Sequence, residues 1–163
     1  MTTREALQML QTDPVAQELL RAPLLARLAY TWRDGTPRVV PMWFHWTGEE
    51  FLMGAPPNAP KMRVLADRPD VAFTIDTDEW PYLVLSVRGT ASHELVETVF
   101  PEYAAMARRY LGDEGGQQFL ALARQTFSRW ARIVIRPEAV RLIDFRTGFP
   151  SAWSAGAAQR GSA

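Results

Sequence analysis

Hydrophobic positions recur at helical spacing at the start of the chain and then change to short alternating runs. Thr2 and Glu5 form a capping-box pattern, which predicts a helix over residues 3–10, and Asp13-Pro14 predicts a second helix over residues 14–20. Farther on, alternating apolar and polar residues between turn residues predict β-strands. The predicted strands cover residues 25–32, 38–46, 51–54, 71–76, 82–93, 129–135 and 140–144, and the first three form an antiparallel meander.

Three further helices are predicted between these strands. The spacing favours one helix over residues 60–67, ended by Pro69, and two amphipathic helices over residues 101–111 and 114–127, separated by Gly112. Six or seven strands with turns between them predict an antiparallel, Greek-key-like β-barrel, because closing the sheet removes its exposed edges. We therefore expect a mainly β fold with peripheral helices.

One domain accounts for the whole chain. The 163 residues suffice for a single well-buried core and are too few for two ordinary domains. Within this domain we expect N-terminal helices in residues 1–22, the barrel in residues 24–144 with helices inserted in residues 97–127, and a tail over residues 146–163. Phe149 and Trp153 are expected to anchor the first half of that tail.

Charge balance and the lack of cysteine narrow the classes of function. Eighteen basic residues balance eighteen acidic ones, so no overall positive field attracts nucleic acid or an anionic membrane surface. Without cysteine there are no disulfides, thiolate zinc sites or cysteine nucleophiles. The chain has no signal-peptide pattern and no apolar run of the roughly 18 residues that a membrane span needs. We expect a cytoplasmic protein that binds neither nucleic acid nor membranes.

The sequence offers little acid–base or metal chemistry. His45 and His93 are the only histidines and lie far apart in the sequence, so we expect neither a metal site nor a Ser-His-Asp triad. The pair Arg108-Arg109 is expected on the solvent-facing side of its helix, and the apolar stripe of that helix is expected in the core. No catalytic residue is assigned.

The helix predicted to begin at Pro60 has an unusual charge pattern. If Pro60 is its first residue, Ala59 is the N-cap and offers no side-chain oxygen to the free N–H groups. Lys61 and Arg63 add positive charge where the helix already carries partial positive charge. A bound phosphate would satisfy both features, so we interpret the segment as an anion site. The alternative is that Asn58 caps the helix and both cations point into solvent.

The strand predicted over residues 38–46 is apolar on both faces. Its even-numbered and odd-numbered positions are both mostly apolar, so both faces are expected to be covered. Pro41 has no N–H to donate, which indicates an edge strand, a bulge or a strand that faces a ligand. The alternative is an ordinary core strand that is buried in a dimer.

The order of these segments resembles a known family. The stretches LLARLAYTWRDGTPRVVPMWFHW, FLMG, KMRVLADRPDVAFTID and YLVLSVRGTA, within about residues 24–91, are similar to the pyridoxamine 5'-phosphate oxidase-like, FMN-binding split-barrel superfamily. Residues 130–137 carry a weaker likeness. The resemblance implies a homodimer of split β-barrels with two flavin-type cofactors in grooves at the subunit interface. It also implies hydride transfer between that cofactor and a small organic substrate.

The resemblance further implies which residues hold the cofactor. A basic residue on the second strand and a lysine after the third bind the phosphate, and these match Arg38 and Lys61, with Arg63 as a further candidate. The ring lies against second-strand backbone, the loop before Tyr82 is a wall of its pocket, and Arg132 reaches in from the partner subunit. The implied cofactor-binding residues are Arg38, Val39, Val40, Pro41, Met53, Gly54, Lys61, Met62, Arg63, Trp80, Tyr82 and Arg132.

One departure from the family pattern bears on the cofactor. Many relatives carry Ser or Thr hydroxyls near the end of the third strand that help to bind the phosphate of FMN, whereas residues 53–57 here read MGAPP. The resemblance implies FMN first, and the departure leaves deazaflavin coenzyme F420 as the alternative. We expect a flavin- or deazaflavin-dependent oxidoreductase, although not one that oxidises pyridoxamine phosphate itself. The alternatives are a non-catalytic dimer that sequesters a flavin, haem or tetrapyrrole, and a structural dimer without a cofactor.

Overall fold

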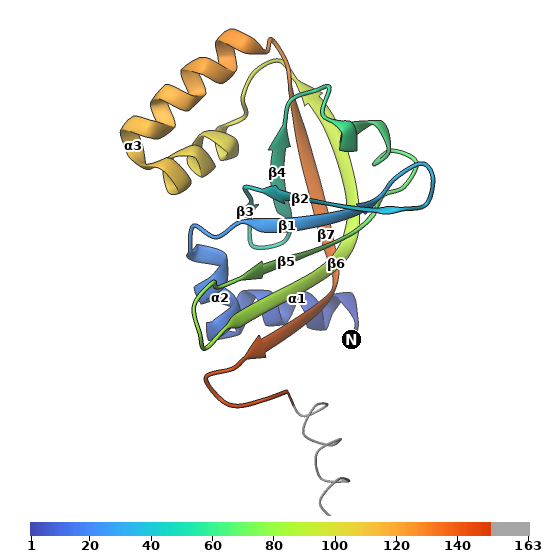
Figure 1. Cartoon of the computed structure of the whole chain (residues 1–163), viewed down its shortest axis with the longest axis vertical. Helices are drawn as coiled ribbons and strands as arrows, with labels where there is room; N and C mark the ends of the chain where they lie inside the picture. Colours follow the sequence, from blue (N-terminus) through green and yellow to red (C-terminus); the bar gives the residue numbers. More distant parts are fainter. Residues whose placement is uncertain (151–163) are drawn as a thin grey trace, which may run out of the picture.

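The structure, a computed structural model, describes residues 1–150 and is built mainly from antiparallel strands (Figure 1). In chain order the elements are α1 (Thr3–Thr12), α2 (Pro14–Arg21), β1 (Ala26–Thr31), β2 (Pro37–Met42), β3 (His45–Trp46), β4 (Phe51–Ala55), the 3-10 helix η1 (Pro60–Arg63), β5 (Asp70–Asp76), β6 (Leu83–Val96), α3 (Pro101–Thr126) and β7 (Trp130–Asp144). The strands form one sheet in the order β2-β1-β5-β6-β7-β4-β3.

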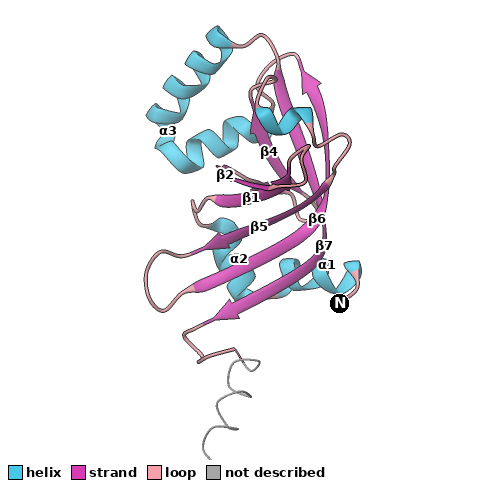
Figure 2. Ribbon diagram, turned by 45° about the vertical axis from the view of Figure 1, so that its right-hand side comes forward, coloured by secondary structure: helices cyan, strands magenta, loops and turns pink. Residues whose placement is uncertain are grey.

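The sheet curves around one hydrophobic core. Its end strands, β2 and β3, are consecutive in the chain and are joined by Trp43 and Phe44, so the strand order returns to where it began. Figure 2 shows the strands as one curved layer with the helices outside it. The expected antiparallel barrel with peripheral helices is confirmed.

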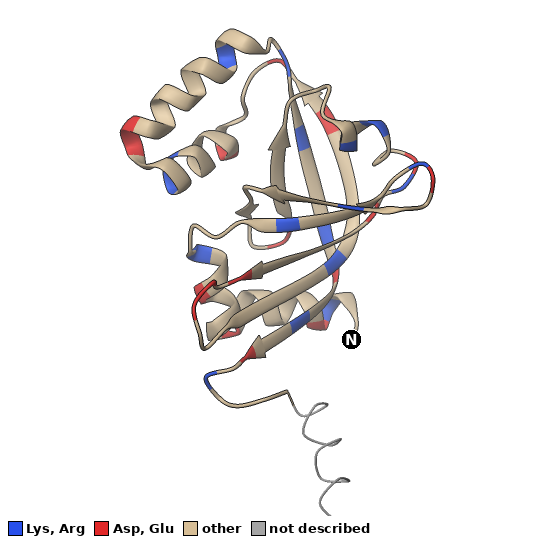
Figure 3. Cartoon of the chain, viewed as in Figure 1, with Lys and Arg blue, Asp and Glu red and all other residues tan. Residues whose placement is uncertain are grey.

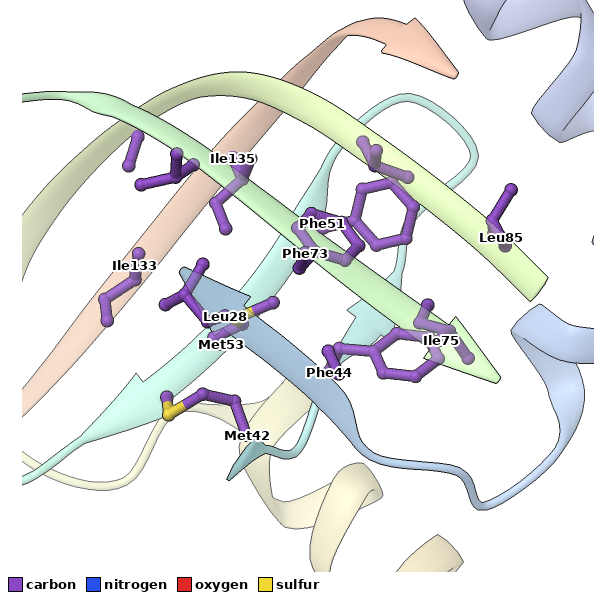
Figure 4. Close-up of a cluster of buried hydrophobic side chains, with 14 of the residues drawn as sticks. Leu28, Met42, Phe44, Phe51, Met53, Phe73, Ile75, Leu85, Ile133 and Ile135 are labelled. Carbon is purple, nitrogen blue, oxygen red and sulfur yellow. The ribbon is translucent and has the colours of Figure 1, made fainter. Parts of the chain in front are cut away.

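The core of the barrel is made of the inward-facing positions of each strand (Figure 4). On β4, Phe51 and Met53 are fully buried inside the barrel, whereas Leu52 on the opposite face is buried against α3. The rings of Phe51 and Phe73 meet edge to face, with centroids 4.8 Å apart. Strand β4 is therefore covered on both faces, by the barrel core and by the helical layer.

The two N-terminal helices follow the sequence closely. The Thr2 hydroxyl accepts a hydrogen bond from the Glu5 backbone, the Glu5 carboxylate accepts one from the Thr2 backbone, and the Asp13 carboxylate caps α2. The side chains that join the barrel core from these helices are those of Ala6, Leu10, Leu19 and Leu20. Across residues 1–150, no helix combines the length and the apolar character needed to cross a bilayer.

Helix α3 consists of two helical halves that meet at a glycine. Gly112 has φ 77°, a left-handed conformation that glycine adopts without strain, and the chain reverses there. A Cβ at Gly116 would lie 3.1 Å from the backbone of Ala107, so the missing side chain lets the two halves approach closely. The two predicted helices separated by Gly112 are confirmed.

The strand predicted over residues 38–46 is wrong as a single strand, because it breaks at Trp43 and Phe44. The Phe44 carbonyl accepts a hydrogen bond from Arg109 Nη2 at 2.6 Å, and the Trp43 ring stacks on Tyr110 with centroids 5.1 Å apart. These contacts with α3 turn the chain away from β2. The predicted meander is correct in its antiparallel pairings, of β2 with β1 and of β3 with β4, and wrong in its continuous middle strand.

The two strands predicted around Arg136 and Pro137 are one continuous strand, β7. It accommodates the proline through a bulge, because Arg88 pairs with Ala139 while Gly89 pairs with Pro137. A Cβ at Gly89 would lie 2.1 Å from the Arg136 carbonyl oxygen, so only glycine fits there. The prediction failed because a proline in a strand usually marks an end, and here it sits at a bulge.

Two further predictions need correction. The helix predicted over residues 60–67 is only the four-residue η1, followed by turns, so no helix dipole acts there. The predicted cover on both faces of β2 is also wrong within one chain, because Val39 is 67% exposed. Phe149 contacts the Phe145 ring and is itself largely exposed, and the predicted anchor Trp153 lies outside the described residues.

Candidate functional site

Lys61 is a buried cation without a counter-ion. It is 7% exposed and is the one charged side chain that is buried in residues 1–150. Its ammonium group makes no ion pair and no hydrogen bond with any of these residues. Burial lowers the pKa of Lys61 from its ordinary value, because the charged form is poorly solvated. The ammonium nitrogen itself keeps some contact with solvent, so an anionic partner from outside the chain can reach it.

The turn that carries Lys61 is also left uncapped. Ala59 is the N-cap of η1, and no side chain accepts a hydrogen bond from the first N–H groups. The alternative reading, in which Asn58 caps the helix and both cations face solvent, is therefore wrong for the cap and for Lys61. It holds for Arg63, which is exposed. The case for an anion site now rests on the unpaired ammonium of the buried Lys61 side chain rather than on a helix end.

Other basic side chains lie at the same end of the barrel. Arg68 Nη2 donates to the Arg33 carbonyl at 3.3 Å, which ties the segment after η1 to the β1–β2 turn. Figure 3 shows basic positions on η1 and at that turn. Arg38 on β2 is exposed, contacts Thr36 and lies 3.9 Å from the Asp34 carboxylate. Arg38, Lys61 and Arg63 thus occupy one region, with Lys61 buried, Arg38 exposed and held by Thr36, and Arg63 exposed.

The backbone of residues 39–41 lies at an open edge of the sheet. Strand β2 pairs only with β1 among the described strands. Pro37 and Pro41 have no N–H to donate to β1. Because residues that exchange hydrogen bonds with a neighbouring strand alternate along it, the residues of β2 that do so are Arg38, Val40 and Met42. The N–H and C=O of Val39 therefore point outward. They are available to a ligand or a second subunit.

Met53 and Gly54 are enclosed in the monomer. The Met53 side chain is fully buried in the barrel, and a Cβ at Gly54 would lie 2.3 Å from Tyr103 Cδ2 and 2.8 Å from Trp130 Nε1. Only their backbone groups are left for a ligand. Met62 is half-buried against the barrel core beside Lys61.

Arg132 lies beside this end of β4 in the same chain. It pairs in register with Gly54, and its Nη1 lies 3.2 Å from the Glu94 carboxylate. Its guanidinium also lies over the Phe100 ring, 5.9 Å from the centroid. Arg132 is thus already held by partners of its own chain, and its reach into a second subunit stays a prediction.

Trp80 and Tyr82 lie at the opposite end of the barrel. They follow the end of β5, whereas η1 precedes its beginning, and a strand of this length spans roughly 20 Å. Figures 1 and 2 both show η1 and the β5–β6 loop on opposite sides. Trp80 is 63% exposed, and its ring meets those of Tyr82 and Phe145. One chain therefore does not bring these aromatic residues to Lys61.

Two features of the site escaped the reasoning from sequence. Lys61 is the only lysine in the chain, beside seventeen arginines, and that count could have singled it out. Arg109, which was expected to face solvent, is half-buried and donates to the Phe44 carbonyl, so that expectation is wrong; it holds for the exposed Arg108. In the described part of the chain, no group of three potential ligands is placed to hold a metal ion.

Comparisons with known proteins show the family and the fold. Residues 12–144 match the family model described as pyridoxamine 5'-phosphate oxidase. Among solved structures, the chain is similar to an F420 reductase, with 30% identity, a TM-score of 0.60, and coverage of 77% of this chain and 94% of the other. No curated protein matches.

Two more distant structures share the fold. A conserved hypothetical protein from Mycobacterium tuberculosis has 20% identity and a TM-score of 0.66, over 85% of this chain and 89% of the other. The haem storage protein HutZ from Vibrio cholerae has 18% identity and a TM-score of 0.57, over 82% and 94%. At these identities the likeness concerns the fold alone, and proteins of this fold include both a reductase and a haem-storage protein.

Proposed function

The chain belongs to the pyridoxamine 5'-phosphate oxidase family, and from this premise we propose that it is an oxidoreductase that binds a phosphate-bearing flavin or deazaflavin. The observation that carries the proposal is the unpaired ammonium at the end of the buried Lys61 side chain. A phosphate next to Lys61 would supply the missing charge partner and accept N–H bonds from the uncapped turn. The residues present therefore fit a cofactor phosphate.

Other residues in the same region as Lys61 can contact the cofactor. Arg38 and Arg63, both exposed, are placed to add charge around the phosphate. The outward N–H and C=O of Val39, between Pro37 and Pro41, suit an edge of a flat heteroaromatic ring. The cofactor, when bound, supplies hydride transfer, and the chain's part is to bind it, orient it and exclude water. This division fits a site in which no acid–base pair is found.

We also propose that the site is completed by a second copy of the chain. Val39 and Trp80 are large apolar side chains that one chain leaves mostly exposed, at opposite ends of the barrel. A homodimer that brings the Trp80–Tyr82 loop of one subunit to the β2 edge of the other would cover both. It would also give the cofactor ring the aromatic wall that a single chain lacks.

The choice between FMN and F420 rests on the segment after β4. Residues 54–57 offer no hydroxyl to a phosphate, so Lys61 is the main anchor, and the similarity to an F420 reductase favours the deazaflavin. A protein that stores haem is the second candidate, because HutZ shares the fold. Haem has carboxylates in place of a phosphate and would need an axial ligand, for which the histidines of the chain are His45 and His93.

The test is a titration of purified apo protein with FMN, F420 and haemin, each repeated in the presence of inorganic phosphate. The proposal expects binding of FMN or F420 that phosphate weakens, and reduction or reoxidation of the bound cofactor with a suitable partner. Tight binding of haemin alone, indifferent to phosphate, would identify a haem-binding protein. Binding of none of the three would refute the cofactor site.

A further inference from the structure

A second cavity lies away from Lys61, between α2, β3 and α3. It has a volume of about 450 Å³, within the range of small-molecule sites. Leu20 and Met106 are buried in its apolar floor, and Trp46 adds a ring. Figure 1 shows α2 and α3 on the side of the molecule opposite η1. The cavity is therefore separate from the proposed cofactor site.

The polar lining of this cavity is positive. Arg21 and Arg109 line it together with His45, and none of its lining residues is an Asp or Glu. Figure 3 shows the basic positions at the end of α2 and on the first half of α3. Two carboxylates lie nearby: Glu18 is held by Arg146 at 3.1 Å, and Glu102 in the first turn of α3 acts on His45. The lining thus carries a formal charge of about +2 that no residue in it balances.

Several donors around the cavity have no acceptor in residues 1–150. Arg109 Nε is buried without a partner, although Nη1 and Nη2 donate to the carbonyls of Leu20 and Phe44. The His45 ring makes no hydrogen bond with the described residues, and Arg21 uses only Nη2, which donates to Gln17. The same bonds of Arg109 tie α3 to α2 and β3, so the cavity is held in shape.

We propose that this cavity binds a small carboxylate with an apolar body. The carboxylate would lie between Arg21 and His45, beside Arg109, and the apolar body would rest on the floor formed by Leu20, Trp46 and Met106. Charge-assisted hydrogen bonds from a guanidinium supply the affinity, and the apolar floor supplies the preference for a ring over a bare ion.

The imidazole provides a direct readout. Burial and the positive charge of Arg109 lower the pKa of His45, whereas Glu102 acts in the opposite direction. A carboxylate placed beside the ring would raise that pKa, because it favours the protonated form. A ligand bound elsewhere on the molecule would not move it.

The experiment is an NMR titration of the full chain with benzoate and, as the uncharged match, benzamide. We expect benzoate to shift the Trp46 indole and His45 ring signals, to raise the His45 pKa, and to bind at least tenfold more tightly than benzamide. Arg21→Gln should weaken benzoate at least tenfold. Arg124→Gln, a change at an exposed arginine of α3 outside the cavity, should leave it unchanged.

Folding is checked separately, since Arg21 is exposed and its replacement should leave the unfolding midpoint unchanged. Equal affinities for benzoate and benzamide, or equal effects of Arg21→Gln and Arg124→Gln, would overturn the proposal. So would benzoate shifts confined to the η1 region. None of these outcomes touches the cofactor proposal, which rests on Lys61.

Discussion

Replacing Lys61 by Met tests the cofactor proposal most directly. Lys61 is 7% exposed and its ammonium has no partner in residues 1–150, so removal of that group from the apo protein breaks no interaction. Methionine retains much of the side-chain length and suits a buried position. We therefore expect Lys61→Met to leave the free energy of unfolding of the apo protein unchanged or to raise it.

Cofactor binding, unlike apo stability, should be weakened by Lys61→Met. A charge-assisted hydrogen bond contributes about 1.5–3 kcal/mol, and about 1.4 kcal/mol is a tenfold change in affinity. Loss of the Lys61 contact should thus weaken FMN or F420 roughly 10- to 150-fold. Fluorescence titration gives the affinities, and urea unfolding of the same preparations gives the apo stability. Arg129→Gln, which removes an exposed arginine on the loop before β7, is the matched control.

The pH dependence gives a second reading of the same substitution. Burial lowers the Lys61 pKa below 10.5, so between that lowered value and 10.5 the unfolded chain binds more protons than the native one. Stability of the apo protein should therefore rise with pH in this window, and Lys61→Met should lose the rise. As the chain has one lysine, a protein labelled at lysine gives one NMR signal from which this pKa is read.

Three results would refute the reasoning. If Lys61→Met binds both cofactors as tightly as the unchanged protein, the phosphate lies elsewhere. If the variant instead loses several kcal/mol of apo stability, the ammonium has a partner that the monomer does not show. A cofactor that binds without raising the Lys61 pKa would also place its phosphate away from this side chain.

Three other predictions concern the helical layer. Gly54→Ala should destabilise the protein by about 1–3 kcal/mol, because its Cβ would meet the Tyr103 ring. Gly115→Ala in α3 should leave the stability unchanged or raise it, and chemical denaturation measures both variants. Tyr110→Phe should lower the free energy of unfolding by about 1 kcal/mol, since the hydroxyl donates to the Leu24 carbonyl at 2.6 Å. An unchanged free energy of unfolding would contradict this. Burial raises the pKa of Tyr103 to about 12, so stability should fall as pH rises above 10, and a Tyr103→Phe variant should lack that fall.

Local signals predicted the elements whose partners are close in sequence. The capping box at Thr2 and Glu5, the Asp13-Pro14 start and the break at Gly112 all appear in the structure. Each depends on hydrogen bonds or backbone freedom within a few residues, which the sequence displays directly.

Errors arose where a distant segment decides the local structure. The break after β2 depends on Arg109 and Tyr110, more than sixty residues away from Phe44. The bulge at Pro137 depends on Gly89 in the neighbouring strand. Neither contact leaves a periodic signal in the segment that it reshapes, and periodicity is what the strand predictions used.

The candidate site shows the same difference between local signals and contacts of distant segments. The resemblance singled out Lys61, and its place after β4 agrees with that expectation, but its burial without a counter-ion depends on packing that no local pattern displays. The separation of Trp80 from Lys61 likewise follows from the length and direction of β5 within the fold. Reasoning along the chain proposed residues for the site and could not arrange them.

The two prolines of β2 have a consequence for how the protein avoids aggregation. An exposed edge strand can pair with the strand of another molecule and so begin a growing sheet. On the outward side of β2, Pro37 and Pro41 offer no N–H, and Val39 alone retains one. This edge is therefore a poor template for fibril-like growth. A second copy that meets it finds Val39 as the one outward backbone donor of β2 and must be held largely by side chains, which favours a closed pair of subunits over an open-ended chain of them.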